Sequence, residues 1–258
     1  MKKIISLLLA MVLVMTSAAA LADMSDLDRF APYTSVDMEV FKKAGWECSF
    51  DNFKFNAEIY PKTQTIEFLA DKDGSKILGA GNYSSVATTY QIRMDLKVIY
   101  SAGSCVVIPR FIFARSGSKP YYDDRMTDVY IVNGENRYNV DVSGCSRSSS
   151  SKYYTATDSS VEPMYLGGML MLQDLAEYPQ GVFVKMGSYT DKIWLENTDL
   201  AAIKTFYETC KEAGVFEQSY LQNHKDDYSI ITLFNENGVQ GTESASDDLN
   251  TPAPTEDN

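Results

Sequence analysis

The residue types that most often carry out catalysis are scarce in this sequence. His224 is the single histidine, so any Ser-His-Asp or Cys-His mechanism would have to use it, and zinc sites built from several histidines are excluded. It lies in a polar stretch between predicted elements, and the chain contains no G-x-S-x-G nucleophile motif. A solvated loop histidine is the better interpretation. We therefore predict no catalytic residue and no cofactor.

Acidic residues offer two further kinds of chemistry. Residues 71–74 resemble the start of an EF-hand calcium loop, but the twelfth position is Asn82 instead of glutamate, so a hairpin turn is favoured and no metal site is predicted. Paired carboxylates for glycoside hydrolysis need no fixed spacing in the sequence. A carboxylate-dependent hydrolase that acts on a polysaccharide or a cell-wall polymer therefore stays open as the alternative function.

Tyrosines in polar segments indicate a binding surface. Two predicted loops, residues 116–125 and 144–160, carry adjacent tyrosines and flank one predicted hairpin with strands 126–132 and 137–142. Antiparallel pairing brings the two open ends of that hairpin together. The candidate ligand-binding residues are Tyr121, Tyr122, Asp123, Asp124, Arg147, Tyr153 and Tyr154. Aromatic rings with nearby charges suit a sugar or a polar peptide, whereas packing of these tyrosines on the sheet rim is the structural alternative.

Four cysteines are available for disulfide chemistry. They are Cys48, Cys105, Cys145 and Cys210. An even number of cysteines in an exported chain predicts disulfides, with three possible pairings, and buried thiols are the alternative. Because no C-x-x-C motif occurs, neither a thioredoxin-like redox pair nor a zinc ribbon is indicated.

The elements that would position these residues are mostly strands. Residues 88–100 alternate between apolar side chains, predicted to face a core, and polar ones such as Asp95, predicted to face water. Residues 105–115 form the next strand, and helices are predicted over residues 36–44, 163–178 and 198–213, the last with Thr198 as its N-cap. The sequence thus predicts an α+β fold, with an antiparallel sheet or sandwich-like core and two to three helices packed on it.

Both ends of the chain differ in composition from its middle. Lys2 and Lys3 precede an apolar run over residues 4–15 and a site ending in Ala22, the pattern of a bacterial-type signal peptide cleaved after Ala22. The run is too short for a spanning helix, so no stable membrane insertion is predicted after cleavage. Residues 236–258 carry six acids and no lysine or arginine, which predicts a disordered tail. A single domain over residues 23–235 lies between.

Composition and charge narrow the function classes. The chain has 258 residues, 45% of them hydrophobic, and a net charge of −12, which falls to −14 once the two lysines of the signal segment are removed. Such a charge argues against nucleic-acid binding. We therefore predict a secreted, extracellular binding or accessory domain without catalytic activity, whose ligand is a glycan or a protein. No oligomeric state is predicted.

Overall fold

The long hairpin at the centre of the fold follows from the alternation in the sequence. The computed structural model describes residues 21–22, 24–51, 55–62, 65–70, 88–118, 126–150, 155–163, 165–186, 192–223 and 230–234. In it, β5 (Thr88–Ser101) pairs along nearly its whole length with β6 (Ser104–Ser118). Ala102 and Gly103 form the turn with φ values of 51° and 84°. Positive φ at both central positions matches the twist of the two strands.

The first sheet, sheet A, is built around this hairpin. Its strand order is β1-β2-β3-β5-β6-β10-β9, and β4 also pairs with β5. The strands beside the hairpin are β1 (Leu21–Ala22), β2 (Glu47–Asp51), β3 (Asn56–Tyr60), β4 (Thr65–Ala70), β9 (Ser146–Ser150) and β10 (Thr155–Pro163). All of the pairs are antiparallel.

The serine-rich segment 144–160 is not the loop that the sequence predicts. It contains β9 and most of β10, and β10 pairs with residues 110–118 of β6. The prediction is wrong because it relied on apolar alternation. A long strand such as β6 needs hydrogen-bond partners for its main chain on both edges, and serine and threonine can supply them.

The second sheet, sheet B, has the order β12-β11-β7-β8-β13. Its strands are β7 (Asp128–Asn133), β8 (Asn136–Asp141), β11 (Val182–Met186), β12 (Ile193–Trp194) and β13 (Ile230–Phe234). The hairpin predicted with strands 126–132 and 137–142 is confirmed by the antiparallel register of β7 and β8. Strands β11 and β12 also pair antiparallel.

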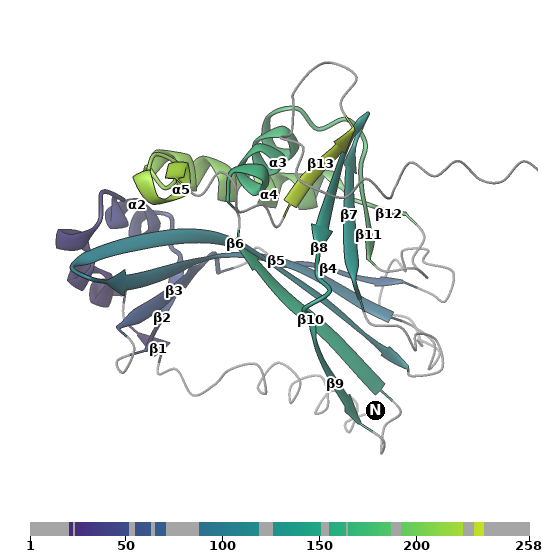
Figure 1. Cartoon of the computed structure of the whole chain (residues 1–258), viewed down its shortest axis with the longest axis horizontal. Helices are drawn as coiled ribbons and strands as arrows, with labels where there is room; N and C mark the ends of the chain where they lie inside the picture. Colours follow the sequence, from purple (N-terminus) through teal and green to yellow (C-terminus); the bar gives the residue numbers. More distant parts are fainter. Residues whose placement is uncertain are drawn as a thin grey trace, which may run out of the picture.

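The helices fill the space beside the sheets, and with the antiparallel sheets they confirm the predicted α+β fold. They are α2 (Met38–Lys43), α3 (Leu166–Glu177), α4 (Asn197–Glu212), α5 (Ser219–Asn223) and two short 3₁₀ turns, η1 (Met24–Arg29) and η2 (Ala31–Tyr33). Figure 1 shows α3 and α4 above sheet A and beside sheet B. None of the helices in the described part of the chain is long and apolar enough to cross a membrane.

The N-cap of helix α4 lies two residues before the one that the sequence predicts. Its N-cap is Glu196, whose main-chain N–H donates a hydrogen bond to Oδ2 of Asp199 at 2.8 Å. Thr198 is therefore already inside the first turn, and the predicted N-cap is wrong. The acidic Asp199 does lie in the first turn, where a negative charge interacts favourably with the helix dipole.

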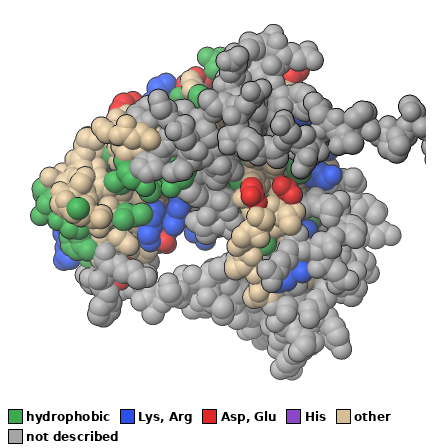
Figure 2. Space-filling view, in the orientation of Figure 1, with side chains coloured by type: hydrophobic (Ala, Val, Ile, Leu, Met, Phe, Trp, Pro, Cys, Tyr) green, Lys and Arg blue, Asp and Glu red, His purple; other side chains and the backbone are tan. Residues whose placement is uncertain are grey.

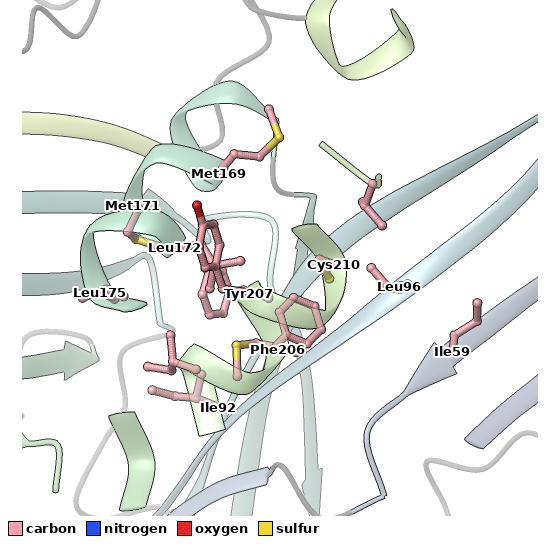
Figure 3. Close-up of a cluster of buried hydrophobic side chains, with 14 of the residues drawn as sticks. Ile59, Ile92, Leu96, Met169, Met171, Leu172, Leu175, Phe206, Tyr207 and Cys210 are labelled. Carbon is pink, nitrogen blue, oxygen red and sulfur yellow. The ribbon is translucent and has the colours of Figure 1, made fainter. Parts of the chain in front are cut away.

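The two main helices join the inner faces of the sheets into one core. The indole of Trp46 stacks on Phe206 of α4, with ring centroids 5.5 Å apart. Figure 3 shows Phe206 and Cys210 of α4 close to Leu96 of sheet A and near the apolar side chains of α3. Burying one such side chain contributes about 1.5–3 kcal/mol. Buried residues from both sheets belong to this single cluster, while the domain limits at residues 22 and 235 stay predictions.

A half-buried carboxylate fixes α3 to sheet B. Oδ2 of Asp174 accepts hydrogen bonds from Asn133 Nδ2 (2.9 Å), Asn136 Nδ2 (3.0 Å) and the hydroxyl of Tyr138 (2.8 Å). Burial and the nearby Asp174 carboxylate both raise the pKa of Tyr138, which keeps its hydroxyl protonated as a donor. Because Asn133 and Tyr138 point toward α3, the alternate residues of β7 and β8 lie on the opposite, outer face of sheet B.

A glutamine fixes the segment after α4 to sheet A. Gln218 is 5% exposed, and its side-chain oxygen accepts a hydrogen bond from the N–H of Val107 at 2.9 Å. Its side-chain nitrogen donates to the carbonyl oxygens of Val107 (2.8 Å) and Val215 (2.7 Å). Val107 lies beyond the part of β6 that pairs with β10. One side chain thus makes the two main-chain contacts that a neighbouring strand would make there.

Candidate functional site

The structure describes only one of the seven ligand-binding residues that the sequence predicts. Arg147 lies on β9, partly exposed and opposite Asp158 of β10. The other six lie outside the described residues, as does His224; they are Tyr121, Tyr122, Asp123, Asp124, Tyr153 and Tyr154. The proposed patch of four tyrosines therefore stays a prediction.

The ends of the β7–β8 hairpin do lie together, as antiparallel pairing requires. The N–H of Val142 donates to the carbonyl oxygen of Thr127 at 2.8 Å. The thiol of Cys145 donates to the carbonyl oxygen of Met126 at 3.0 Å. The chain then enters β9 of sheet A, so Arg147 and the hairpin belong to different sheets.

The structure does not contain the disulfides expected from the sequence. All four cysteines are buried, and no disulfide joins Cys48, Cys105, Cys145 and Cys210. Two strands separate Cys48 on β2 from Cys105 on β6, so their Cα atoms lie more than about 14 Å apart at roughly 4.8 Å per strand. A disulfide needs Cα atoms within about 7 Å. Burial raises the pKa of Cys105 to about 11 and also raises that of Cys210, so neither thiol is a reactive nucleophile.

The outer face of sheet B presents aromatic rings to solvent. Nine side chains of four strands point outward here, and we call seven of them the aromatic face: Tyr130, Val132, Arg137, Asn139, Phe183, Lys185 and Trp194. The other two, Asp128 and Asp141, lie opposite each other at the far ends of β7 and β8. The strand registers place Trp194 opposite Phe183, Phe183 opposite Val132, and Val132 opposite Arg137. These four side chains form a row that crosses the strands.

Trp194 is the most prominent member of this row. Its side chain is 53% exposed, yet it contacts the protein on two sides. The Phe183 ring meets it edge-on with centroids 5.1 Å apart, and a Cβ added to Gly181 would lie 3.5 Å from Cζ3 of the indole. Gly181 also has a φ of +71°, which favours glycine. The indole is thus supported by its neighbours while much of its surface remains open.

Positive charges surround the exposed rings. The ammonium group of Lys192 lies 4.8 Å from the centroid of Phe183, and Lys185 follows Phe183 on the same face of β11. Neither lysine forms an ion pair with any residue that the structure describes. Arg137 is exposed at the far end of the row. The outward carboxylates of this face, Asp128 and Asp141, lie four residues away from the Val132–Arg137 pair along β7 and β8. In a chain with a net charge of −12, the positive charges are therefore concentrated along the row.

Polar groups complete the aromatic face. Tyr130 is 36% exposed, and burial, with a smaller contribution from Asp128, raises the pKa of its hydroxyl, so that it stays a donor at neutral pH. Opposite Tyr130, the side-chain oxygen of Asn139 is buried and has no hydrogen-bond partner. The face can therefore offer rings, cations and the Tyr130 hydroxyl to one ligand, whereas the Asn139 oxygen lies out of reach.

The outer face of sheet A carries charges of a different kind. We call it the paired-charge face, and its members are Glu58, Asp95, Lys97 and Arg110. The Arg110 guanidinium donates from Nε to Oδ1 and from Nη2 to Oδ2 of Asp95, both at 2.7 Å. Glu58 Oε1 lies 3.0 Å from Lys97 Nζ and 3.2 Å from Arg110 Nη2. Figure 2 shows basic and acidic side chains side by side on the visible surface.

The alternation in β5 predicts Asp95 to face water, and this prediction is wrong. Its side chain is only 1% exposed, although it lies on the outer face of sheet A opposite Arg110. The alternation identifies the face correctly. It does not reveal that the long Arg110 side chain, directly across the strand pair, covers and binds the carboxylate.

The paired-charge face is the best place to look for the hydrolase alternative. Burial raises the pKa of Asp95 against the opposing effect of Arg110. Burial also opposes ionisation of Glu58, but Lys97 and Arg110 together lower its pKa. A carboxyl pair with opposite shifts is typical of glycosidases. Here, however, both oxygens of Asp95 accept hydrogen bonds from Arg110 and the group is buried, so it cannot protonate a substrate oxygen.

Metal chemistry and known relatives add no further site. Within the described ranges, no three or more His, Cys, Asp and Glu side chains group as metal ligands would. Comparisons with protein families, with curated proteins and with solved structures found no match for this chain. Among the described residues, the observations that bear on function therefore come from the outer faces of sheets A and B.

The aromatic face was not predicted from the sequence, although the two strands of the β7–β8 hairpin were. The signal was present in the alternation of the β11–β12 hairpin, where Phe183 and Trp194 occupy the positions that normally carry polar residues. Adjacent aromatic residues on the solvent side of paired strands form a contiguous apolar patch, which is a mark of an interaction site.

Proposed function

We propose that this protein is an exported binding protein without catalytic activity, and that the aromatic face holds its ligand outside the cell. The observation that carries the proposal is Trp194, a ring supported by Phe183 and Gly181 but 53% exposed. Burying such a ring would stabilise the chain by a few kcal/mol. A fixed aromatic ring left open is instead suited to stack on a ligand with little loss of conformational entropy.

The surroundings of Trp194 support binding over catalysis. The rings lie on a strand-built sheet, which is more rigid than a loop, and a rigid site loses less entropy on binding. Among the described residues, the carboxylate pair with the most suitable pKa shifts is Asp95 with Glu58, and Arg110 engages both members. These observations on the described residues support a recognition surface, because this carboxylate pair is not open to substrate.

Substitution of Trp194 tests this function. Binding of the protein purified from the culture medium would be screened on glycan and peptide arrays, and each ligand found would be titrated. We expect Trp194→Ala to weaken binding about tenfold or more, since one stacked ring contributes about 1–3 kcal/mol by analogy with base stacking. Tyr33→Ala is the matched control, because Tyr33 is 42% exposed but packs on Tyr100 of sheet A. Equal binding by Trp194→Ala and the wild type would refute the proposal.

Export itself can be tested separately by mass spectrometry of the protein in the medium. We expect the mature chain to begin at Asp23. Residues 1–20 lie outside the described residues, while Leu21 and Ala22 form β1 and pair with Ser49 and Cys48 of β2. Cleavage after Ala22 would remove this two-residue strand and leave the rest of sheet A. A chain in the medium that still carries its first 22 residues would contradict the proposed processing.

A further inference from the structure

We infer that the ligand of the aromatic face is an acidic polysaccharide, an inference that rests on the proposed function. Exposed rings alone would suit many partners. Three observations together narrow the choice: the length of the row, the lysines beside it, and the shortness of the strand at its edge.

The length of the row indicates an extended ligand. Trp194, Phe183, Val132 and Arg137 lie on four adjacent strands. At roughly 4.8 Å between neighbouring strands, the row spans about 14 Å from Trp194 to Arg137. A polymer that runs across the strands would contact the indole at one end and the guanidinium at the other.

The charges along the row indicate a negative ligand. Lys192 lies against the ring of Phe183, and Lys185 lies two residues further along β11. Since neither lysine has an ion-pair partner among the described residues, a ligand carboxylate or sulfate can bind them without breaking a contact. The net charge of −12 over the whole chain would repel an anionic ligand elsewhere, so the complementarity is local.

The strand at the edge of the sheet favours a sugar polymer over an acidic peptide. An extended peptide gains affinity by adding a strand to an exposed edge through main-chain hydrogen bonds. The edge beside Trp194 is β12, which has two residues, Ile193 and Trp194. Such an edge offers few main-chain contacts. Stacking on the face of the sheet, by contrast, suits the flat C–H surfaces of sugar rings while their acidic groups reach the lysines.

Affinity electrophoresis of the protein from the medium tests this inference. Native gels would contain polygalacturonate (carboxylate groups), heparin (sulfate groups), neutral galactan or polyglutamate. We expect retardation by an acidic polysaccharide, weakened by added salt, and stronger than that by galactan or polyglutamate. The carboxylate and sulfate arms identify which acidic group is recognised.

Charge-neutral variants locate the effect on the aromatic face. We expect Lys185→Gln/Lys192→Gln to weaken binding roughly fivefold, because each exposed charge pair contributes modestly. Lys43→Gln/Lys204→Gln is the matched control; it removes the same charge from α2 and α4, where Lys204 is 58% exposed, and it should bind like the wild type. If both double variants weaken binding equally, net charge alone explains the retention and the inference is overturned.

The remaining outcomes separate this inference from the proposed function. Retention by galactan that depends on Trp194 but not on Lys185 or Lys192 would refute the inference that the ligand is acidic. It would still agree with the proposed binding function. Stronger retention by polyglutamate than by either acidic polysaccharide would overturn the inference in favour of a peptide. Failure of all four polymers would also overturn it. Only a Trp194→Ala variant that keeps full binding to every identified ligand would remove the proposed function itself.

Discussion

The outer faces of the two sheets both carry charged side chains, but the charges have opposite surroundings. On the paired-charge face of sheet A, Arg110 binds Asp95 through two hydrogen bonds and also contacts Glu58. On the aromatic face of sheet B, Lys185 and Lys192 have no carboxylate partner among the described residues. Charges whose partners lie within the chain stabilise the fold, whereas charges without such partners remain able to bind something else.

Removing Arg110 should produce the largest loss of stability. Arg110→Ala would leave the Asp95 carboxylate buried without a counter-charge, and we expect the free energy of unfolding to fall by about 3–5 kcal/mol. Urea denaturation of the purified protein measures this change. The double variant Asp95→Leu/Arg110→Met removes both charges and should be closer to the wild type. A loss below about 1 kcal/mol for Arg110→Ala would mean that the pair is not structural.

The next largest loss of stability should follow removal of Asp174, whose hydrogen bonds fix α3 to the inner face of sheet B. Asp174→Ala removes the acceptor of three hydrogen bonds, from Asn133, Asn136 and Tyr138, and we expect a loss of about 2–3 kcal/mol in unfolding free energy. Tyr138→Phe removes one of these bonds and should cost about 1 kcal/mol. Gln173→Ala, on the preceding residue of α3, is the control and should stay within about 0.5 kcal/mol. Equal losses of unfolding free energy for Asp174→Ala and Gln173→Ala would contradict the role of Asp174 in fixing α3 to sheet B.

The aromatic face should show the reverse pattern, with a small effect on folding and a large one on binding. Trp194→Ala loses its edge contact with Phe183 and part of its buried area, so we expect at most about 1 kcal/mol of destabilisation. Lys185→Gln/Lys192→Gln should change the unfolding free energy by less than about 0.5 kcal/mol. The same urea titrations provide the measurement. A loss near that of Arg110→Ala would show that the face is structural and would end the contrast between the two sheets.

The smallest effect should appear in the pH dependence of stability. Because the pKa of Glu58 is lowered in the folded chain, its ionised form stabilises the fold at pH values above its ordinary pKa of 4.5, and this contribution is lost as the pH falls through the lowered value. Glu58 is 39% exposed, so solvent screening keeps the contribution below about 1 kcal/mol. Glu58→Gln should flatten the acid side of the stability curve in urea titrations. An unchanged slope would count against the ion pairs with Lys97 and Arg110.

Strands whose side chains alternate between apolar and polar can be predicted from the sequence. Strands that are held mainly by main-chain hydrogen bonds cannot. The period of two in β5 identifies the central hairpin. The helix predicted over residues 198–213 corresponds to α4, which ends at Glu212 with Ala213 as its C-cap. Strands β9 and β10 carry no such period. Main-chain pairing holds β10 to β6 and β9 to β10. Only the three-dimensional arrangement brings Phe183, Trp194 and the glycine at position 181 together, since supporting contacts across strands leave little trace in local spacing.

The contact between Gln218 and β6 has a consequence for how the protein behaves among copies of itself. An uncovered strand edge is a template on which another chain can pair, and proteins avoid aggregation by covering such edges. Gln218 occupies both the N–H and the carbonyl oxygen of Val107, so an incoming strand finds neither group available. A single amide on the segment that follows a helix thereby closes sheet A to intermolecular growth at this point.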